Sequence, residues 1–137
     1  MMERTEKVAI VIDTASYERV AFALSMASAA ATMKDVRIIF GNGGIIRLKK
    51  GYTDAVGGET AAWLRERVRL AVKMHSLPPI SELLETLNKF GAKIYACPAA
   101  MELHGLVKDD LVKEVDEVRS IVRFTIEDIK EATVIYV

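Results

Sequence analysis

Residues 7–13 read Lys7-Val8-Ala9-Ile10-Val11-Ile12-Asp13, an unbroken apolar run, largely β-branched, that ends at a carboxylate. Such a run is typical of a strand buried on both faces of a parallel sheet. Three further apolar runs follow, at residues 36–40, 92–96 and 133–137. Helical patterns lie between the runs, at residues 17–33, 59–75, 81–90 and 118–130. This alternation predicts an α/β fold of flavodoxin-like type, with a parallel sheet of four or five strands and helices on both faces.

The composition fits one globular domain spanning residues 1–137, because 51% of the residues are hydrophobic and 28% are charged. Lys+Arg and Asp+Glu balance at 19 each, which gives no electrostatic reason to expect binding to nucleic acid or to an anionic membrane. The charged residues 1–7 and the short apolar run 8–12 do not make a signal sequence, and the apolar run 20–33 is too short to span a bilayer. We therefore expect a cytoplasmic protein.

The single cysteine and two histidines exclude an intramolecular disulfide and show no zinc-ligand spacing. We expect no metal and no organic cofactor. A lone thiol is also more consistent with a reducing compartment.

Several segments between the strands carry weaker signals. Residues 13–16 supply capping oxygens for the helix at 17–33, whose many alanines would let it approach a sheet or another subunit closely. Residues 45–58 show no clear period, which predicts a partly mobile loop with one helical turn at most. Residues 106–115 are ambiguous, with a short strand at 111–112 as one interpretation.

Cys97 follows the apolar run 92–96 and precedes a helical pattern that begins at Pro98. A thiol at the start of a helix lies near the positive end of the helix dipole, which stabilises the thiolate. In a parallel sheet, residues that directly follow strands meet at one edge. We therefore expect Cys97, residues 13–14 and residues 41–44 to lie together. The alternative is that Cys97 is an inert, buried, small apolar residue.

The stretch from Lys93 to Leu106, which reads KIYACPAAMELHGL, resembles the DsrE/DsrF-like family of sulfur-relay proteins. The segments 79–84 and 133–137 also fit this family. The resemblance implies a flavodoxin-like fold and a homo-oligomer, often a trimer or a multiple of one. It also implies that Cys97 carries sulfur, as a persulfide or thiosulfonate, between donor and acceptor proteins. With one cysteine and no close base, a carrier is more credible than a sulfurtransferase with independent turnover.

Other residues near the predicted edge are candidates for substrate binding. Asn42, Gly43 and Gly44 could form an amide nest for an oxyanion, or a plain turn. Pro98 and Met101 follow Cys97 in the predicted helix, and Met101 could equally fill the core or an interface.

His104 is a possible auxiliary group two helical turns beyond Cys97, about 10 Å along the axis, and could also be a solvated helix-end histidine. Positive charge from Arg47, Lys49 and Lys50 could lie beside the glycine loop or in solvent.

A second functional hypothesis is a non-catalytic module on the same fold, in which the glycine loop holds a small anion or contacts a protein partner and Cys97 is incidental. A nucleotide-binding function is less favoured, because the chain lacks both the G-x-G-x-x-G spacing and the Walker A pattern.

Overall fold

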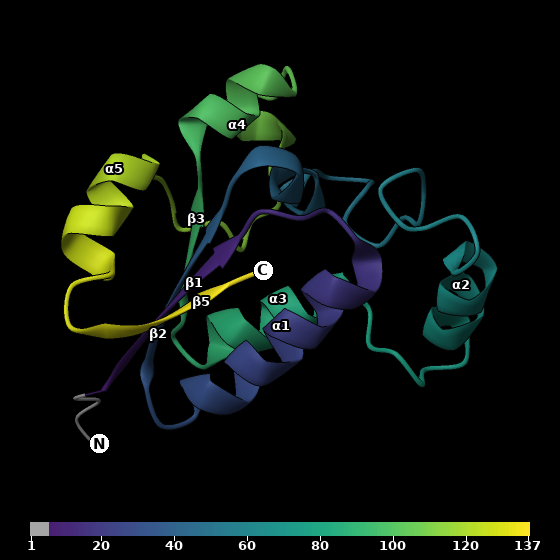
Figure 1. Cartoon of the computed structure of the whole chain (residues 1–137), viewed down its shortest axis with the longest axis horizontal. Coiled ribbons are helices and arrows are strands. Elements are labelled where there is room, and N and C mark those ends of the chain that lie inside the picture. The colour runs from purple at the N-terminus through teal and green to yellow at the C-terminus, as the bar shows by residue number, and fades with distance from the viewer. Residues whose placement is uncertain (1–5) are drawn as a thin grey trace.

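A computed structural model describes residues 6–137, so the charged residues 1–5 lie outside the described chain. Five parallel strands form one sheet in the order β4-β3-β2-β1-β5 (Figure 1). The strands are β1 (Lys7–Ile12), β2 (Asp35–Phe40), β3 (Lys93–Ala96), β4 (Glu117–Val118) and β5 (Ala132–Tyr136). The prediction of a parallel α/β sheet with four or five strands is confirmed.

Helices cover both faces of the sheet. Helices α1 (Tyr17–Ala31) and α3 (Ile80–Lys89) pack side by side on one face (Figure 1). On the other face, α5 (Ile121–Arg123) continues into the π-helical turn η3 (Phe124–Asp128). Helix α4 (Pro98–Leu103) lies at the carboxyl ends of the strands, and α2 (Arg65–Lys73) lies away from the sheet. None of the helices within residues 6–137 is long and apolar enough to cross a membrane.

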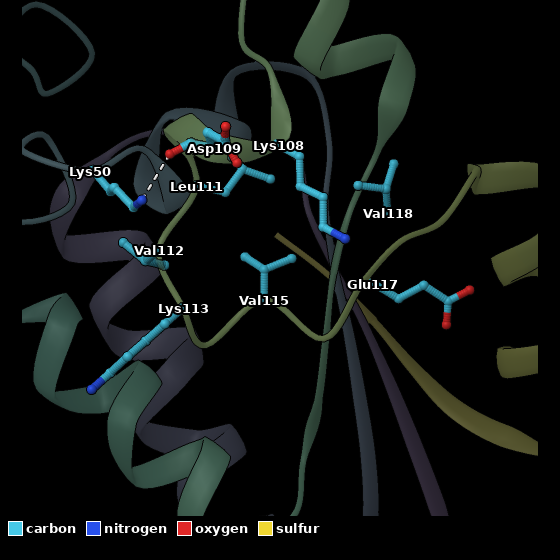
Figure 2. Close-up of a pocket in the computed structure, with 9 residues that line it drawn as sticks. All are labelled: Lys50, Lys108, Asp109, Leu111, Val112, Lys113, Val115, Glu117 and Val118. Atoms are coloured by element: carbon cyan, nitrogen blue, oxygen red, sulfur yellow. Dashed lines mark hydrogen bonds between the residues drawn. The ribbon is translucent and has the colours of Figure 1, made fainter.

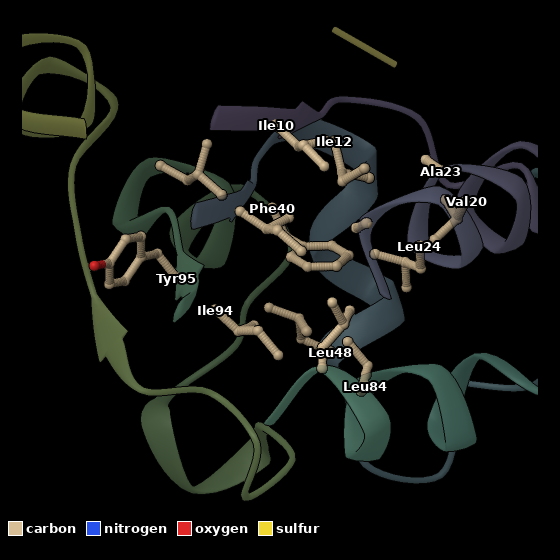
Figure 3. Close-up of a cluster of buried hydrophobic side chains, with 14 of the residues drawn as sticks. Ile10, Ile12, Val20, Ala23, Leu24, Phe40, Leu48, Leu84, Ile94 and Tyr95 are labelled. Carbon is tan, nitrogen blue, oxygen red and sulfur yellow. The ribbon is translucent and has the colours of Figure 1, made fainter. Parts of the chain in front are cut away.

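The main core lies between the sheet and the pair α1–α3. Side chains of Ile10 and Phe40 point from the strands toward Leu24 of α1 and Leu84 of α3 (Figure 3). Because strand side chains alternate between faces, Ile39 and Tyr95 point to the opposite face, where the Tyr95 ring meets that of Phe124 edge-on. Both faces are therefore packed, as the unbroken apolar runs predict.

Most alanines of α1 are buried within the subunit. Those with at most 2% of their surface exposed are Ala21, Ala23, Ala27 and Ala31, whereas Ala29 is exposed. The outer face of this helix exposes Phe22 and Met26, and Met33 is exposed in the turn that follows. The buried alanines therefore serve packing within the chain, and large apolar groups occupy outward positions.

Residues 45–58 contain the expected helical turn, followed by irregular chain, and are held by contacts that the sequence does not reveal. A 3-10 helix, η1 (Asn42–Leu48), follows β2 directly. Within it, Arg47 is fully buried and donates to the Ala15 carbonyl at 2.9 Å, the Ala55 carbonyl at 2.6 Å and Glu59 Oε1 at 2.6 Å. A buried guanidinium satisfied in this way ties the segment to the start of α1.

Glu59 completes this buried pair. Its burial would raise the pKa of its carboxyl group, but hydrogen bonds from the Gly57 amide and the Tyr52 hydroxyl, together with the charge of Arg47, outweigh burial and lower the pKa. The carboxylate form of Glu59 is thus stabilised beside Arg47.

The same segment supplies the caps of two helices. The Thr60 hydroxyl accepts from the Tyr17 amide at 3.1 Å, and Asp54 accepts from the Ser81 amide at 2.9 Å. The Ser16 side chain, although at the predicted cap position, makes no capping hydrogen bond. Because residues 54–60 are used in this way, α2 begins only at Arg65 and not at 59 as predicted.

The last third of the chain also differs from expectation. Residues 111–112 form no strand with the sheet: Leu111 makes one antiparallel bridge with Lys49, after the short 3-10 helix η2 (Lys108–Asp110). The sheet contact comes later, where the Arg119 amide donates to the Ala96 carbonyl at 2.9 Å. A two-residue strand is too short to give a periodic signal, so β4 lies outside the ambiguous segment 106–115, and the last helix begins at Ile121 and not at 118 as predicted.

Candidate functional site

A cavity of about 190 Å³ lies at the carboxyl ends of the strands. Its lining comes from the ends of β1, β2, β3 and β5, from the start of α4 and from α5. The lining residues are Val11, Asp13, Ile39, Gly41, Asn42, Cys97, Ala99, Ala100, Ile121 and Tyr136. The structure thus brings together Asp13, Asn42 and Cys97, as expected for residues that follow neighbouring parallel strands.

Cys97 is positioned by the backbone on both sides. Its amide donates to the Phe40 carbonyl at 3.0 Å, which continues the pairing of β3 with β2, and its carbonyl accepts from the Met101 amide at 3.0 Å, which starts α4. Pro98 occupies the first helical position, where a missing N–H costs nothing. The thiol is 6% exposed and its side chain makes no capping hydrogen bond. Cys97 is thus largely buried and lines the cavity.

The polar side of the cavity is built around Asp13. The Asn42 side-chain amide donates to Asp13 Oδ1, and the Tyr136 hydroxyl donates to the same carboxylate. This hydrogen bond raises the pKa of the exposed Tyr136 phenol, because ionisation would place two negative charges together. Asn42 has a φ of 44°, a left-handed conformation that asparagine tolerates better than most residues. These contacts fix the amide of Asn42 beside the thiol cavity.

The glycines after Asn42 serve the backbone and do not line the cavity. The Gly44 amide donates to the Gly41 carbonyl at 2.9 Å and lies 3.2 Å from the Asp13 carbonyl. A Cβ atom on Gly44 would lie 2.5 Å from the Ile12 carbonyl oxygen, whereas one on Gly43 would have no neighbour closer than 3.8 Å. The Gly44 amide is thus used within the fold and is not presented to an oxyanion.

The other predicted site residues lie apart from the cavity lining. Met101 is 7% exposed and belongs to the hydrophobic core. Pro98 is exposed beside Cys97, and His104 is exposed at the end of α4, where its amide donates to the Ala100 carbonyl at 3.1 Å. Of the candidates, Asn42 alone joins Cys97 in the wall of the cavity.

Sequence reasoning missed Tyr136, Ile121 and Ala99. Tyr136 ends β5, and in parallel register it pairs with Val11 near the end of β1, so its place at a strand end was a usable signal. Ile121 begins α5 after a two-residue strand that the sequence pattern did not reveal.

The α5 wall of the cavity is held by a buried ionic cluster. Asp128 is fully buried and accepts from Arg119 Nη1 and Arg37 Nη1, each at 2.8 Å. The Arg119 guanidinium also lies over the Tyr95 ring, 4.2 Å from its centroid. These contacts fix the turn that follows Ile121 against the sheet.

A second cavity, of about 280 Å³, lies beside β4 (Figure 2). It has a floor of Val112, Val115 and Val118, and three lysines are among its lining residues, Lys50, Lys108 and Lys113. Lys50 donates to the Asp109 carbonyl at 2.8 Å, and Figure 2 shows Lys108 extending over the valines. Of the two alternatives for the nearby positive charges, the solvent-exposed one holds for Lys49 and Lys50, whereas Arg47 is buried, and none of the three lines the thiol cavity.

Within residues 6–137, no three His, Cys, Asp or Glu side chains are placed to hold a metal ion.

The family model for the DsrE/DsrF-like family matches residues 6–133. Solved structures with the same fold include the ychN protein of E. coli, with 14% identity and a TM-score of 0.67 over 96% of this chain and 99% of that chain. Another is MTH1491 of Methanobacterium thermoautotrophicum, a protein of unknown function with 20% identity and a TM-score of 0.63 over 96% and 99% of the two chains. No curated protein matches the sequence.

Proposed function

Because the chain belongs to the DsrE/DsrF-like family, we propose that it is a sulfur carrier that holds sulfane sulfur on Cys97. The observation that carries this proposal is the position of the only cysteine. Cys97 lines a cavity at the carboxyl edge of a parallel sheet, where α/β proteins bind their ligands.

The chemistry requires only the thiol and two exchange steps. In the first, the Cys97 thiolate attacks a divalent sulfur of the donor and the donor's S–S bond breaks. A hydropersulfide or thiosulfate leaves one sulfur on Cys97 as a persulfide and departs as a thiolate or sulfite, whereas tetrathionate leaves an S–SO3⁻ group as a thiosulfonate and departs as thiosulfate. In the second, an acceptor thiolate attacks that sulfur and Cys97 leaves as thiolate. Each step moves sulfur without net oxidation.

The size of the cavity supports a small cargo. At about 190 Å³ it is smaller than the ~300–1,000 Å³ typical of pockets for drug-sized ligands and cofactors. A terminal sulfur with its first neighbours fits this volume, whereas a nucleotide does not. Carriage is therefore favoured over the nucleotide-binding hypothesis.

The remaining candidates take supporting roles in this proposal. Asn42, which lines the same cavity, contacts the sulfur donor, and Gly43 and Gly44 shape the turn that follows it. Pro98 starts α4 and Met101 anchors it in the core. His104, exposed at the far end of α4, is placed to contact a partner protein.

The exchange needs protein partners on both sides, a sulfur donor and a sulfur acceptor, because a single thiol cannot resolve its own persulfide. The reducing cytoplasm suits a thiol that must return to its free form. We also propose that the chain forms a homo-oligomer, an expectation that comes from the family.

Intact mass spectrometry tests the carrier function. Wild type and Cys97→Ser are incubated with polysulfide, thiosulfate and tetrathionate, and then with a reductant. We expect a sulfur adduct on the wild type that the reductant removes and that Cys97→Ser never forms. Circular dichroism establishes that the variant is folded. A wild type that takes up no sulfur from any of the three donors would exclude this function.

A further inference from the structure

The thiol cavity carries charge of one sign. None of the described residues that line it is a lysine, arginine or histidine, whereas one lining residue, Asp13, is an aspartate. The second cavity, by contrast, is lined by charges of both signs, three lysines together with Asp109 and Glu117. A cleft with one sign of charge and low-dielectric walls selects among ions that enter it. The charge of Asp13 therefore bears on which donors reach Cys97.

The carboxylate of Asp13 is held in place and is not neutralised. Its two side-chain partners, the amide of Asn42 and the hydroxyl of Tyr136, are uncharged donors. Such donors orient a carboxylate without cancelling its charge. Asp13 takes part in none of the ion pairs within residues 6–137, and the buried pairs lie in the Arg119 and Arg47 clusters.

We propose that Asp13 is a specificity-determining residue that repels dianionic donors such as thiosulfate and tetrathionate, so that Cys97 takes its sulfur from a hydropersulfide. This inference rests on the proposed carrier function and narrows it. In this proposal the protein distinguishes between donors by electrostatic repulsion of the dianionic ones, and repulsion of unwanted ligands is a common source of specificity.

The favoured step balances without another reactant. The Cys97 thiolate attacks the outer sulfur of R–S–S–H, the S–S bond of the donor breaks, and R–S⁻ leaves with the bonding pair, so that Cys97 holds S–S–H. The leaving thiolate then takes a proton from water. With thiosulfate or tetrathionate, two negative charges would have to approach both Asp13 and the attacking thiolate.

Access to Cys97 can be measured with methanethiosulfonate reagents that differ only in head group, one with a neutral 2-hydroxyethyl group and one with an anionic 2-sulfonatoethyl group. The rate at which each reagent modifies Cys97 is divided by the rate at which the same reagent modifies free 2-mercaptoethanol, which corrects for the reagent's intrinsic reactivity. We expect wild type to favour the neutral reagent by about tenfold or more, and Asp13→Asn to reduce this preference several-fold. Glu102→Gln removes an exposed carboxylate of α4 outside the cavity lining and should keep the wild-type preference.

Salt provides a second test that needs no variant. Raising the ionic strength should speed the anionic reagent on wild type more than the neutral one, because salt screens charges near a cavity mouth. Equal normalised rates for the two reagents on wild type, or an unchanged preference in Asp13→Asn, would overturn the role of Asp13.

Sulfur transfer separates this inference from the function on which it rests. Wild type is offered 2-hydroxyethyl hydropersulfide or tetrathionate, and adduct formation is followed by intact mass. Faster transfer from the hydropersulfide is expected. Tetrathionate reacting as fast would refute the selectivity and leave the carrier function standing, whereas no transfer from either donor, with the reagent preference intact, would refute the carrier function alone.

Discussion

Gly44 is required by a close approach of two backbone segments. It lies in η1 where this 3-10 helix crosses the end of β1, and its amide is within reach of the Asp13 carbonyl at 3.2 Å. The atom that a side chain would meet there is the Ile12 carbonyl oxygen, which belongs to a central strand and cannot move aside easily. Any residue with a Cβ atom must therefore push η1 away from β1.

We predict that Gly44→Ala destabilises the protein by about 1–3 kcal/mol, as overpacking against fixed atoms does. The matched control is Gly43→Ala, whose Cβ atom would meet only ordinary contacts at 3.8 Å or more and should cost little. Urea unfolding followed by circular dichroism measures both. A Gly44→Ala variant as stable as Gly43→Ala would show that η1 can shift at no cost.

Single residues of the site were predictable only where strand order alone places them. Cys97, Asn42 and Asp13 each follow an apolar run, and parallel strands bring such residues to one edge. Gly44 and Met101 were chosen for their type and chain position, but their roles depend on a backbone crossing and on helix orientation. Neither of these can be read from spacing.

At the scale of elements, the packing of α5 and η3 against the sheet depends on ion pairs as well as on apolar contacts. Phe124 is buried against the sheet, but much of the outer surface of this segment is exposed, and its inner end is fixed through Asp128 to Arg37 and Arg119. Since the segment contributes Ile121 to the thiol cavity, its docking controls one wall of the site.

We predict that Asp128→Asn costs about 3 kcal/mol of stability, because it leaves the buried Arg119 guanidinium without its closest carboxylate. Amide hydrogen exchange should speed up across residues 121–130, and the loosened wall should raise the rate at which iodoacetamide alkylates Cys97.

Glu127→Gln is the matched control for this change. Glu127 is partly exposed and its closest ion pair is with Arg123 at 3.0 Å, so its loss should change stability by less than about 1 kcal/mol. If Asp128→Asn matched this control in both stability and alkylation, the ionic cluster would have no role in holding α5.

The element that sequence reasoning placed worst is the segment from 45 to 60. Its order depends on Arg47, a residue type that is rarely fully buried, and on side-chain caps that reach α1 and α3 from far along the chain. Such contacts have long sequence separation and no periodic signature. The helices at 17–33 and 81–90 were found because their apolar stripes repeat locally, and the structure confirms them as α1 and α3.

At the scale of the whole molecule, the fold was predictable because apolar strands alternate with helical patterns along the chain, and β1 is buried on both faces. The order β4-β3-β2-β1-β5 satisfies the rule of parallel strands joined by covered crossovers. The alternation of strands and helices does not predict which apolar surfaces of the folded chain stay exposed to solvent.

Among the uncovered apolar surfaces of the described chain, two belong to elements that form or cover the sheet. One, the α1 stripe, is made of Phe22 and Met26 of α1 and Met33 in the turn after it. The other, which we call the β5–α5 surface, combines the edge strand β5 with α5 and η3. Its exposed apolar residues are Ile121, Val122, Ile126, Val134 and Tyr136. It includes more apolar residues and an unpaired strand edge, both of which favour association.

We therefore propose that a second copy of the chain covers the β5–α5 surface in the homo-oligomer. Light scattering coupled to size-exclusion chromatography should give a wild-type mass of more than one subunit. Ile126→Asp should shift that mass toward the monomer, because a charge would be desolvated in the contact. Phe22→Asp, a matched change on the α1 stripe, should leave the assembly intact. Dissociation by Phe22→Asp alone would place the contact on α1, and a monomeric wild type would refute the assembly.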